Sequence, residues 1–182
     1  SLRPADWLCG LRRGEILALS KNDIDRANHE ISIQNAVTFD KNNPIFKHYP
    51  KSDAGVRTIP LPENLQEILY PYLDSLDGIF LFEMERKSGL MSKSSYDKFW
   101  RKITDKINTA AGGKKKIKVI HNLTAHVFRH NYATMLYYAD VDIKDAQRLL
   151  GHSNIRITLE IYTHLDKSKS KANEKLKNIS AL

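Results

Sequence analysis

The sequence predicts a mainly helical α+β domain with one small antiparallel sheet, and three observations support this fold class. Apolar residues recur at helical spacing in long stretches, as in 63–76 and 92–111. Alternating apolar residues flanked by turn residues are confined to 30–61. Of the 182 residues, 41% are hydrophobic, which is enough for one buried core in a chain of this length. We therefore expect a single domain.

Helices are predicted before and after the strand-rich stretch. A short helix spans 11–19, with its apolar residues on one side. Pro62 and Glu63 begin a second helix that continues to about Leu76. Ser92 or Ser94 caps a third helix that ends near Ala111, and its apolar stripe is expected in the core: Tyr96, Phe99, Trp100, Ile103 and Ile107.

The strand-rich stretch predicts one three-stranded antiparallel sheet. Its strands are expected at 30–39, 45–49 and 56–61, and the loop PKSDAG joins the last two. Lys51 lies at the start of that loop. From base rates alone, a turn lysine is simply solvated.

The first helix carries a candidate anion-binding arginine. Arg12 and Glu15 are three residues apart, so an ordinary surface ion pair worth about 0.5 kcal/mol would explain them. Gly10 supports a second interpretation, because it lets the chain turn so that Arg12 lies in the first turn of the helix. There a guanidinium can bind a phosphate group beside backbone N–H donors.

The stretch 123–164 concentrates imidazole, guanidinium and phenol groups on three short helices. His126 and Arg129 are three residues apart and share a helix face, so they can act on one substrate group. A histidine–arginine pair of this kind suggests phosphate chemistry.

The middle helix of this stretch, at 143–150, is expected to end at Gly151 in the left-handed conformation. The next residue, His152, then lies at a sharp corner. A Ser-Asn pair caps a third helix, which carries Tyr162 about two turns from its start. The tyrosine is therefore expected on a rigid scaffold.

The net charge of +8, from 29 Lys and Arg against 21 Asp and Glu, suits a nucleic acid partner, although many basic proteins bind none. The run GGKKKIK contributes candidate DNA-phosphate contacts at Lys114, Lys115, Lys116 and Lys118. The single cysteine, Cys9, excludes an internal disulfide and is expected to be buried. The longest apolar runs are only a few residues, so no membrane span and a cytoplasmic, nucleoid-associated location are expected.

These motifs, in this order, resemble the tyrosine recombinase (phage integrase) family. The strings H-x-x-R-H, L-L-G-H and I-Y-T-H have the family's spacing. CGLRRGE resembles the family's first arginine segment, T-G-L-R-x-x-E, with Cys9 where threonine is commoner. PKSDAGVRTIPLP resembles the hairpin that carries the family's lysine. The matched motifs run from Gly10 to His164.

The resemblance implies a recombinase catalytic domain at 1–165, whose upstream core-binding domain is expected to be absent from this chain. It implies a polar tail at 166–182 that packs on an adjacent subunit, double-stranded DNA as partner, and a tetramer on DNA. It also implies a catalytic set made up of Arg12, Lys51, His126, Arg129, His152 and Tyr162. Glu15 and His130 are expected to support this set. His130 would do so either as a core residue or by orienting Arg129 or a backbone group. Lys47 is a weaker rival for Lys51, and His164 has no assigned role.

The residue types alone account for strand cleavage and joining without a cofactor. A tyrosine that attacks a phosphodiester conserves the bond energy in a phosphotyrosine, so no ATP is required. Arg12 and Arg129 can neutralise the charge that develops on phosphorus without a metal ion. Lys51 can protonate the departing 5′-oxygen, and His126 can accept the phenol proton of Tyr162.

Three other protein classes remain as alternatives. A type IB topoisomerase uses a similar set of residues without site preference. A noncatalytic DNA-binding helix bundle would explain the charge but not the ordered motifs. A zinc hydrolase would use His126 and His130, which are four residues apart, but the glutamate of the zinc-peptidase motif is replaced by Val127 and no C-x-x-C pair is present.

Overall fold

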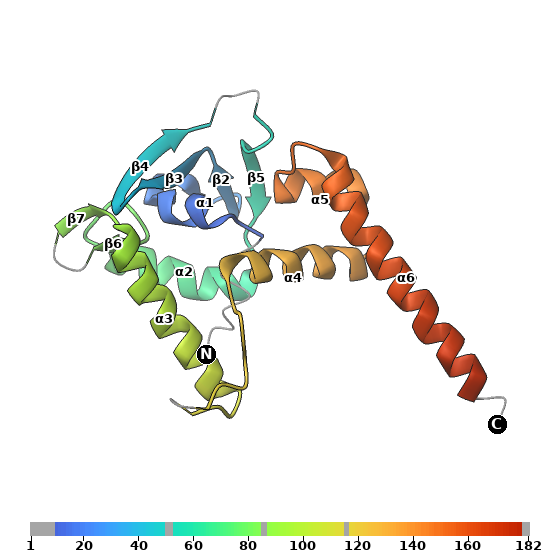
Figure 1. Ribbon diagram of the computed structural model, residues 1–182. Helices are drawn as coiled ribbons and strands as arrows, with labels where there is room; N and C mark the ends of the chain where they lie inside the picture. The colour runs from blue at the N-terminus through green and yellow to red at the C-terminus, as the bar shows by residue number, and fades with distance from the viewer. Residues whose placement is uncertain (1–9, 50–52, 85–86, 115–116, 180–182) are drawn as a thin grey trace.

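A computed structural model describes residues 10–49, 53–84, 87–114 and 117–179 of the chain. Within these residues, no helix combines the length and the apolar character needed to cross a membrane. The helices and strands follow the chain in this order (Figure 1): α1 (Arg13–Ala18), η1 (Lys21–Asp23), β1 (Ile24–Asp25), β2 (Glu30–Ile33), β3 (Asn35–Asp40), β4 (Asn43–His48), β5 (Arg57–Pro60), α2 (Glu63–Ser75), β6 (Glu83–Met84), β7 (Lys87–Leu90), α3 (Lys93–Ala110), α4 (Ala125–Tyr138), α5 (Ile143–Leu150) and α6 (Ile155–Ile179).

The α+β class with a three-stranded antiparallel sheet is confirmed, but the membership of the sheet differs from the prediction. β2 pairs with β1 on one side and with β5 on the other. β3 and β4 form a separate hairpin, and β6 and β7 form another. The strand predicted at 30–39 is therefore two strands in two sheets, and β1 takes the place in the sheet that was predicted for 45–49.

The chain changes sheet between β2 and β3, where the alternation of apolar residues loses its phase. Ile31 and Ile33 are buried with an exact spacing of two, whereas Ala36 and Val37 are adjacent and both buried. This second pair lies against α1. A Cβ at Gly14 would lie only 2.6 Å from the carbonyl oxygen of Val37, so glycine allows α1 to rest directly on β3.

Two hydrophobic clusters hold these elements together. The larger joins the β1-β2-β5 sheet to α2, α4 and α5, and its members include Leu11, Ile33, Ile59, Leu69 and Leu150. The smaller joins α1, β3 and α3, and its buried members are Leu17, Ala18, Val37 and Tyr96. The larger cluster includes Leu11, which precedes Arg12, and Leu150, which lies two residues before His152. It therefore supports the backbone around both of these candidate site residues.

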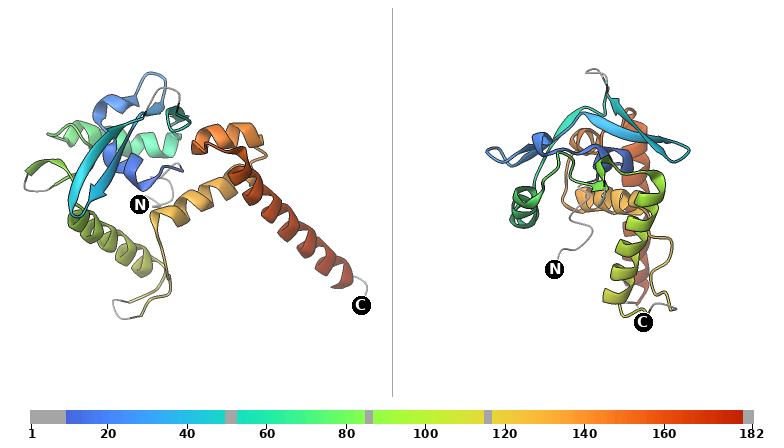
Figure 2. Two further views of the ribbon diagram at one scale, coloured as in Figure 1. Left: turned by 45° about the horizontal axis from the view of Figure 1, so that its top comes forward. Right: turned by 90° about the vertical axis from the view of Figure 1, so that its left-hand side faces the viewer.

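The three helices predicted after residue 123 are confirmed. α5 has the predicted bounds, and Gly151 ends it with a φ of 65°. α6 continues from Ile155 to Ile179 without a break at residues 165 and 166, where the sequence predicted that a tail begins. Figures 1 and 2 show α6 projecting past the end of α4, away from the sheets.

Candidate active site

Arg12 lies at the entrance to α1. It is the N-cap residue of α1, whereas it was predicted one position later, in the first turn of the helix. Its backbone N–H donates to the Glu15 carboxylate at 2.8 Å. Its Nη1 also donates to the Glu15 carboxylate at 2.7 Å. Gly10 has a φ of 71°, and a Cβ there would lie 2.4 Å from the Tyr132 ring. The turn that positions Arg12 therefore requires glycine.

Glu15 is a buried carboxylate shared by two arginines. Its side chain is 0% exposed, and Arg57 donates to its two oxygens at 2.9 and 3.1 Å. Burial alone would raise the pKa of Glu15, but the ion pair with Arg57 and the hydrogen bonds from Arg57 and Arg12 outweigh it and lower the pKa below 4.5. Glu15 is therefore ionised at neutral pH and fixes both guanidinium groups.

Arg129 reaches the same cluster from α4. It is buried, and its guanidinium donates to the carbonyl oxygens of Gly10 and Leu150. Burial, followed by the nearby charge of Arg12, lowers the pKa of Arg129 to about 10. The side chain remains cationic at neutral pH.

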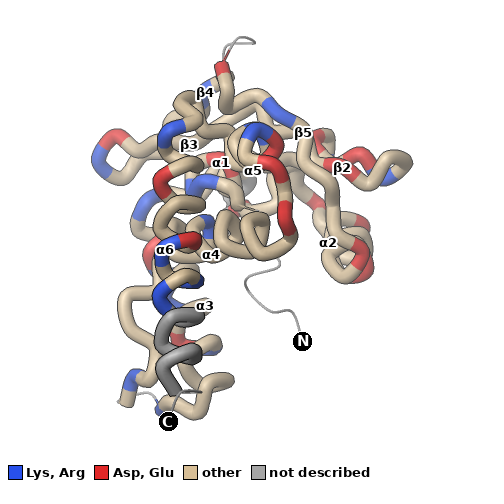
Figure 3. The backbone as a smooth tube through the Cα atoms, turned by 90° about the vertical axis from the view of Figure 1, so that its right-hand side faces the viewer, with Lys and Arg blue, Asp and Glu red and all other residues tan. Residues whose placement is uncertain are grey.

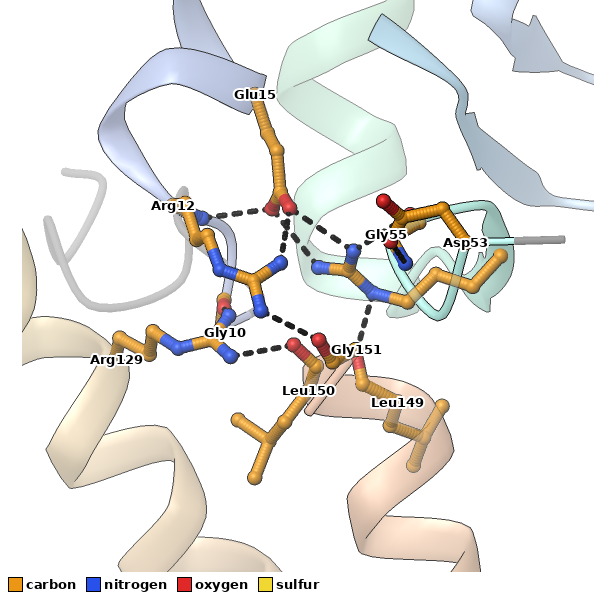
Figure 4. Close-up of polar contacts among 10 residues, drawn as sticks. Gly10, Arg12, Glu15, Asp53, Gly55, Arg129, Leu149, Leu150 and Gly151 are labelled. Atoms are coloured by element: carbon orange, nitrogen blue, oxygen red, sulfur yellow. Dashed lines mark hydrogen bonds and ion pairs between the residues drawn. The ribbon is translucent and has the colours of Figure 1, made fainter. Parts of the chain in front are cut away.

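The end of α5 receives one hydrogen bond from each of these arginines. Arg57 Nε donates to the Leu149 carbonyl at 2.8 Å, Arg129 to Leu150 and Arg12 to Gly151. Figure 4 shows the Leu150 and Gly151 carbonyls at the helix end, facing Arg129 and Arg12 respectively. The last carbonyls of a helix carry partial negative charge, which stabilises the clustered guanidinium groups. Arg12 and Arg129 have more N–H groups than these contacts use, so an anion can still be bound.

His152 lies at the corner that Gly151 creates. It is 8% exposed, and its Nδ1 shares a hydrogen bond of 2.9 Å with the Thr158 hydroxyl, which is fully buried in α6. Burial, together with the charges of Arg129, Arg12 and Arg57, lowers the pKa of His152 to about 4. The imidazole is therefore neutral at physiological pH and can donate or accept one hydrogen bond through Nε2.

The low pKa of His152 predicts a pH dependence of stability. In the unfolded chain the imidazole binds a proton near pH 6.5, whereas in the folded chain it does so only near pH 4. Stability is therefore expected in full above pH 6.5 and to decrease by roughly 1–3 kcal/mol as the pH falls to about 4. Urea unfolding at pH 7.5 and pH 5 should show a smaller decrease for His152→Asn. An equal decrease in both proteins would contradict the prediction.

Thr158 is expected to stabilise the protein through His152. Thr158→Val keeps the side-chain volume but removes the hydroxyl, which leaves the buried Nδ1 without this partner. We expect the free energy of unfolding to decrease by about 1–3 kcal/mol in urea denaturation. The control is Thr134→Val, since Thr134 is only partly buried and its hydroxyl donates to a backbone carbonyl of its own helix. Equal effects of the two substitutions would show that the hydrogen bond to His152 is not the cause.

A cavity of about 340 Å³ lies beside this cluster, between α4, α5 and α6. His126, Arg129 and His152 all line it, so the structure brings these predicted residues together. His130 and His164 line it as well. His130 is exposed, so the prediction of a core position is wrong, and the contacts that orient Arg129 are carbonyls instead.

Tyr162 is not brought to this cavity. Its hydroxyl donates to the Val141 carbonyl at 3.2 Å, and its ring packs edge-on against Tyr137 with centroids 5.2 Å apart. Among the described residues, its helix neighbours Ile161 and Leu165 line the cavity, but Tyr162 does not. Burial and the charge of Asp142 raise the pKa of Tyr162. In this conformation the phenol is neutral and turned away from the arginines.

The structure describes only some of the lysines that were predicted as site residues. Lys51, Lys115 and Lys116 lie outside the described residues, and so does Cys9. Lys114 and Lys118 are exposed, as phosphate contacts would require. Their contact with DNA stays a prediction.

The described part of the chain contains no group of three or more His, Cys, Asp or Glu side chains that could hold a metal ion. His126 and His130 thus have no third ligand within these residues.

Sequence reasoning missed Arg57 and Thr158. Arg57 shares the buried face of β5 with Ile59, so an arginine in phase with buried apolar residues was the available signal. Thr158 lies three and seven residues before Ile161 and Leu165, on the helix face that lines the cavity. A polar residue on the buried face of a strand or helix indicates a buried polar partner.

Solved recombinase structures share this fold. The Tn1549 transposon integrase in complex with transposon right end DNA matches with a TM-score of 0.72 at 24% identity, over 94% of this chain and 56% of that chain. XerA recombinase matches with a TM-score of 0.63 at 26% identity, over 95% of this chain and 54% of that chain. The fold is thus that of tyrosine recombinase catalytic domains.

The family model described as "Phage integrase family" matches residues 7–169. The chain belongs to this family, the tyrosine recombinases, which confirms the resemblance in the motifs.

Two curated relatives are recombinases. The chain is 33% identical to a XerC-like tyrosine recombinase of Caldanaerobacter subterraneus over 187 residues, covering 93% of this chain and 46% of that protein. It is 25% identical to the ICEBs1 integrase of Bacillus subtilis over 171 residues, covering 91% of this chain and 44% of that protein. The chain therefore spans about half the length of these relatives.

Proposed function

We propose that this chain is the catalytic domain of a mobile-element integrase that cuts and rejoins double-stranded DNA at specific sites through a 3′-phosphotyrosine. The observation that carries the proposal is the gathering of Arg12 and Arg129 on the end of α5, beside a cavity lined by His126 and His152. These groups suit a phosphodiester, because fixed cations stabilise the negative charge that develops on its oxygens. No metal ion or ATP is needed for this step.

Each side chain has a defined part in the reaction. Tyr162 Oη forms a bond to phosphorus as the bond to the 5′-oxygen breaks, and the phenol proton passes to His126. The 5′-oxygen takes a proton from Lys51. Arg12 and Arg129 bind the non-bridging oxygens, and His152 donates a hydrogen bond to one of them. Attack by the 5′-hydroxyl of another strand reverses these steps and frees Tyr162.

This mechanism requires Tyr162 to leave the position seen here. The hydroxyl must release the Val141 carbonyl, and the ring must leave Tyr137. Once beside Arg12 and Arg129, the phenolate is stabilised by two cations, and the pKa of the phenol decreases from its raised value. DNA binding is the event that we expect to favour this rearrangement.

The charge distribution supports DNA as the partner. Figure 3 shows both basic and acidic positions along α6, with Arg156, Lys167, Lys169 and Lys171 against Glu160 and Asp166 in residues 155–171, whereas the α2 side of the molecule carries acidic positions. Structural homologues are recombinases bound to DNA. We further propose that recombinase subunits assemble as a tetramer on DNA, with residues 166–182 docking on a neighbouring subunit, and that the protein acts on cytoplasmic, nucleoid-associated DNA.

The test is covalent trapping followed by peptide mapping. The chain is mixed with a nicked suicide duplex that carries the element's own end sequence, in EDTA and without ATP. A protein–DNA adduct that survives denaturation is expected, and mass spectrometry should place the nucleotide on the peptide that contains Tyr162.

Three results would contradict the proposal. An adduct that depends on added metal or ATP would exclude the stated chemistry. If the protein bound the duplex tightly without forming an adduct, a noncatalytic DNA-binding role would replace it. Relaxation of supercoiled plasmid without site preference would instead indicate type IB topoisomerase activity.

A further inference from the structure

Arg57 is a buried arginine that the proposed mechanism does not use. Its side chain is 2% exposed and lies on the same face of β5 as Ile59, which is fully buried. A guanidinium in such a place is strongly destabilising unless its charge is paired and its N–H groups are bonded. Its contacts therefore indicate its role.

Those contacts join three separate parts of the chain. Nη1 and Nη2 donate to the Glu15 carboxylate of α1 at 3.1 and 2.9 Å. Nε donates to the Leu149 carbonyl at the end of α5 at 2.8 Å, and Nη1 donates at 3.0 Å to the carbonyl of Gly55, in the turn that precedes β5. Arg57 thus connects the helix entrance that carries Arg12 to the corner that carries His152.

The corner fits this guanidinium closely. A Cβ at position 151 would lie 2.6 Å from Arg57 Nη1 and 2.9 Å from its Cζ. Gly151 is therefore required both for its left-handed conformation and for the space that Arg57 occupies. A shift of Arg57 would be transmitted to the residues on either side of Gly151.

The location of Arg57 separates it from the phosphate-binding groups. The cavity of about 340 Å³ is lined by His126, Arg129 and His152 but not by Arg57. Arg57 instead lines a neighbouring cavity of about 230 Å³, together with His152. Arg12 does not line the larger cavity either, but its side chain is 39% exposed, whereas that of Arg57 is 2% exposed. Arg57 can therefore affect the reaction through the groups it holds rather than through the phosphate.

We propose that Arg57 is a positioning residue that fixes Arg12 through Glu15 and the His152 corner through Leu149. The proposal rests on the proposed function. It requires arginine rather than lysine, because only the planar guanidinium can donate two bonds to one carboxylate and a third, from Nε, to a carbonyl on another element. Lysine retains the charge but loses this geometry.

The test compares Arg57→Lys with Arg26→Lys. Arg26 is a matched control, because it also pairs with a carboxylate, that of Asp74, and donates to a backbone carbonyl, that of Tyr70. Unlike Arg57, Arg26 is exposed and lies outside the candidate active site. We expect Arg57→Lys to slow adduct formation on the nicked suicide duplex by about 10²-fold, because misplacement by about 1 Å has effects of this size. The Kd for the duplex should change by less than about threefold, and Arg26→Lys should match the parent.

A second readout does not depend on activity. NMR titration gives the pKa of His152, which should rise toward its ordinary value in Arg57→Lys as the corner loosens, but not in Arg26→Lys. Arg57→Gln, which keeps hydrogen-bonding groups, serves as a second variant, and circular dichroism reports the folded fraction. A parent that forms no adduct would count against the proposed function, while the titration would still decide the role of Arg57.

Two outcomes would overturn the positioning role. One is a folded Arg57→Lys or Arg57→Gln protein that has the parent's adduct rate and an unchanged His152 pKa. The other is loss of folding in both variants, which would assign Arg57 to stability alone.

Discussion

Replacing Tyr162 by phenylalanine is expected to abolish the covalent protein–DNA adduct while leaving the affinity for DNA within about twofold of the parent. The substitution removes only the oxygen that we propose as the nucleophile, and the ring keeps its packing against Tyr137. Within the part of the chain that the structure describes, the hydroxyl loses its hydrogen bond to the Val141 carbonyl. Denaturing gel electrophoresis after incubation with the nicked suicide duplex measures the adduct, and a filter or mobility assay measures the affinity.

Tyr137→Phe is the matched control. Tyr137 is the aromatic neighbour of Tyr162, and its hydroxyl donates to Asp166 of α6. This variant also loses one phenol oxygen, so it should retain the adduct. An adduct formed by Tyr162→Phe at the parent's rate would exclude Tyr162 as nucleophile. Loss of the adduct in both variants would show that packing between α4 and α6, rather than the chemistry of Tyr162, limits the reaction.

Local sequence signals predicted much of the site. The bounds of α5 and the corner at His152 follow from a helical apolar pattern that ends in glycine, because a left-handed residue is what closes such a helix. The shared face of His126 and Arg129 follows from helical spacing, and both line one cavity. The interaction of Arg12 with Glu15 likewise follows from a spacing of three residues.

The features that were missed depend on contacts between distant parts of the chain. Arg57 meets Glu15 and Leu149 only because β5, α1 and α5 come together in the fold. The separation of β3 from β2 is decided by packing of α1 on Val37, and the sequence marks it only by the adjacent apolar residues Ala36 and Val37. The orientation of Tyr162 is decided by Tyr137 and by the Val141 carbonyl. Spacing placed the tyrosine on the right helix, but it did not determine which way the ring turns.

Glu15→Gln is expected to cause a large loss of stability. The substitution leaves Arg57 buried with no carboxylate to balance its charge, and it weakens the contact to Arg12. Removing one partner of a buried ion pair reduces the free energy of unfolding by about 3–5 kcal/mol. Because whole domains are stable by only about 5–15 kcal/mol, the variant should be near its unfolding limit. Urea denaturation at pH 7 measures the difference, and Glu67→Gln, an exposed change in α2, should have a small effect.

The pH dependence of the difference in unfolding free energy between the parent and Glu15→Gln identifies the cause of that difference. The pKa of Glu15 is lower in the folded chain than the ordinary 4.5, so the unfolded chain binds the proton more readily. The stabilisation is therefore present in full above about pH 4.5 and is lost as the pH falls through the lower folded pKa. The gap between the parent and Glu15→Gln should narrow below pH 4.5. If the gap were the same at pH 3 and pH 7, the ionised carboxylate would not be its source, and the volume or packing of the side chain would explain the loss instead.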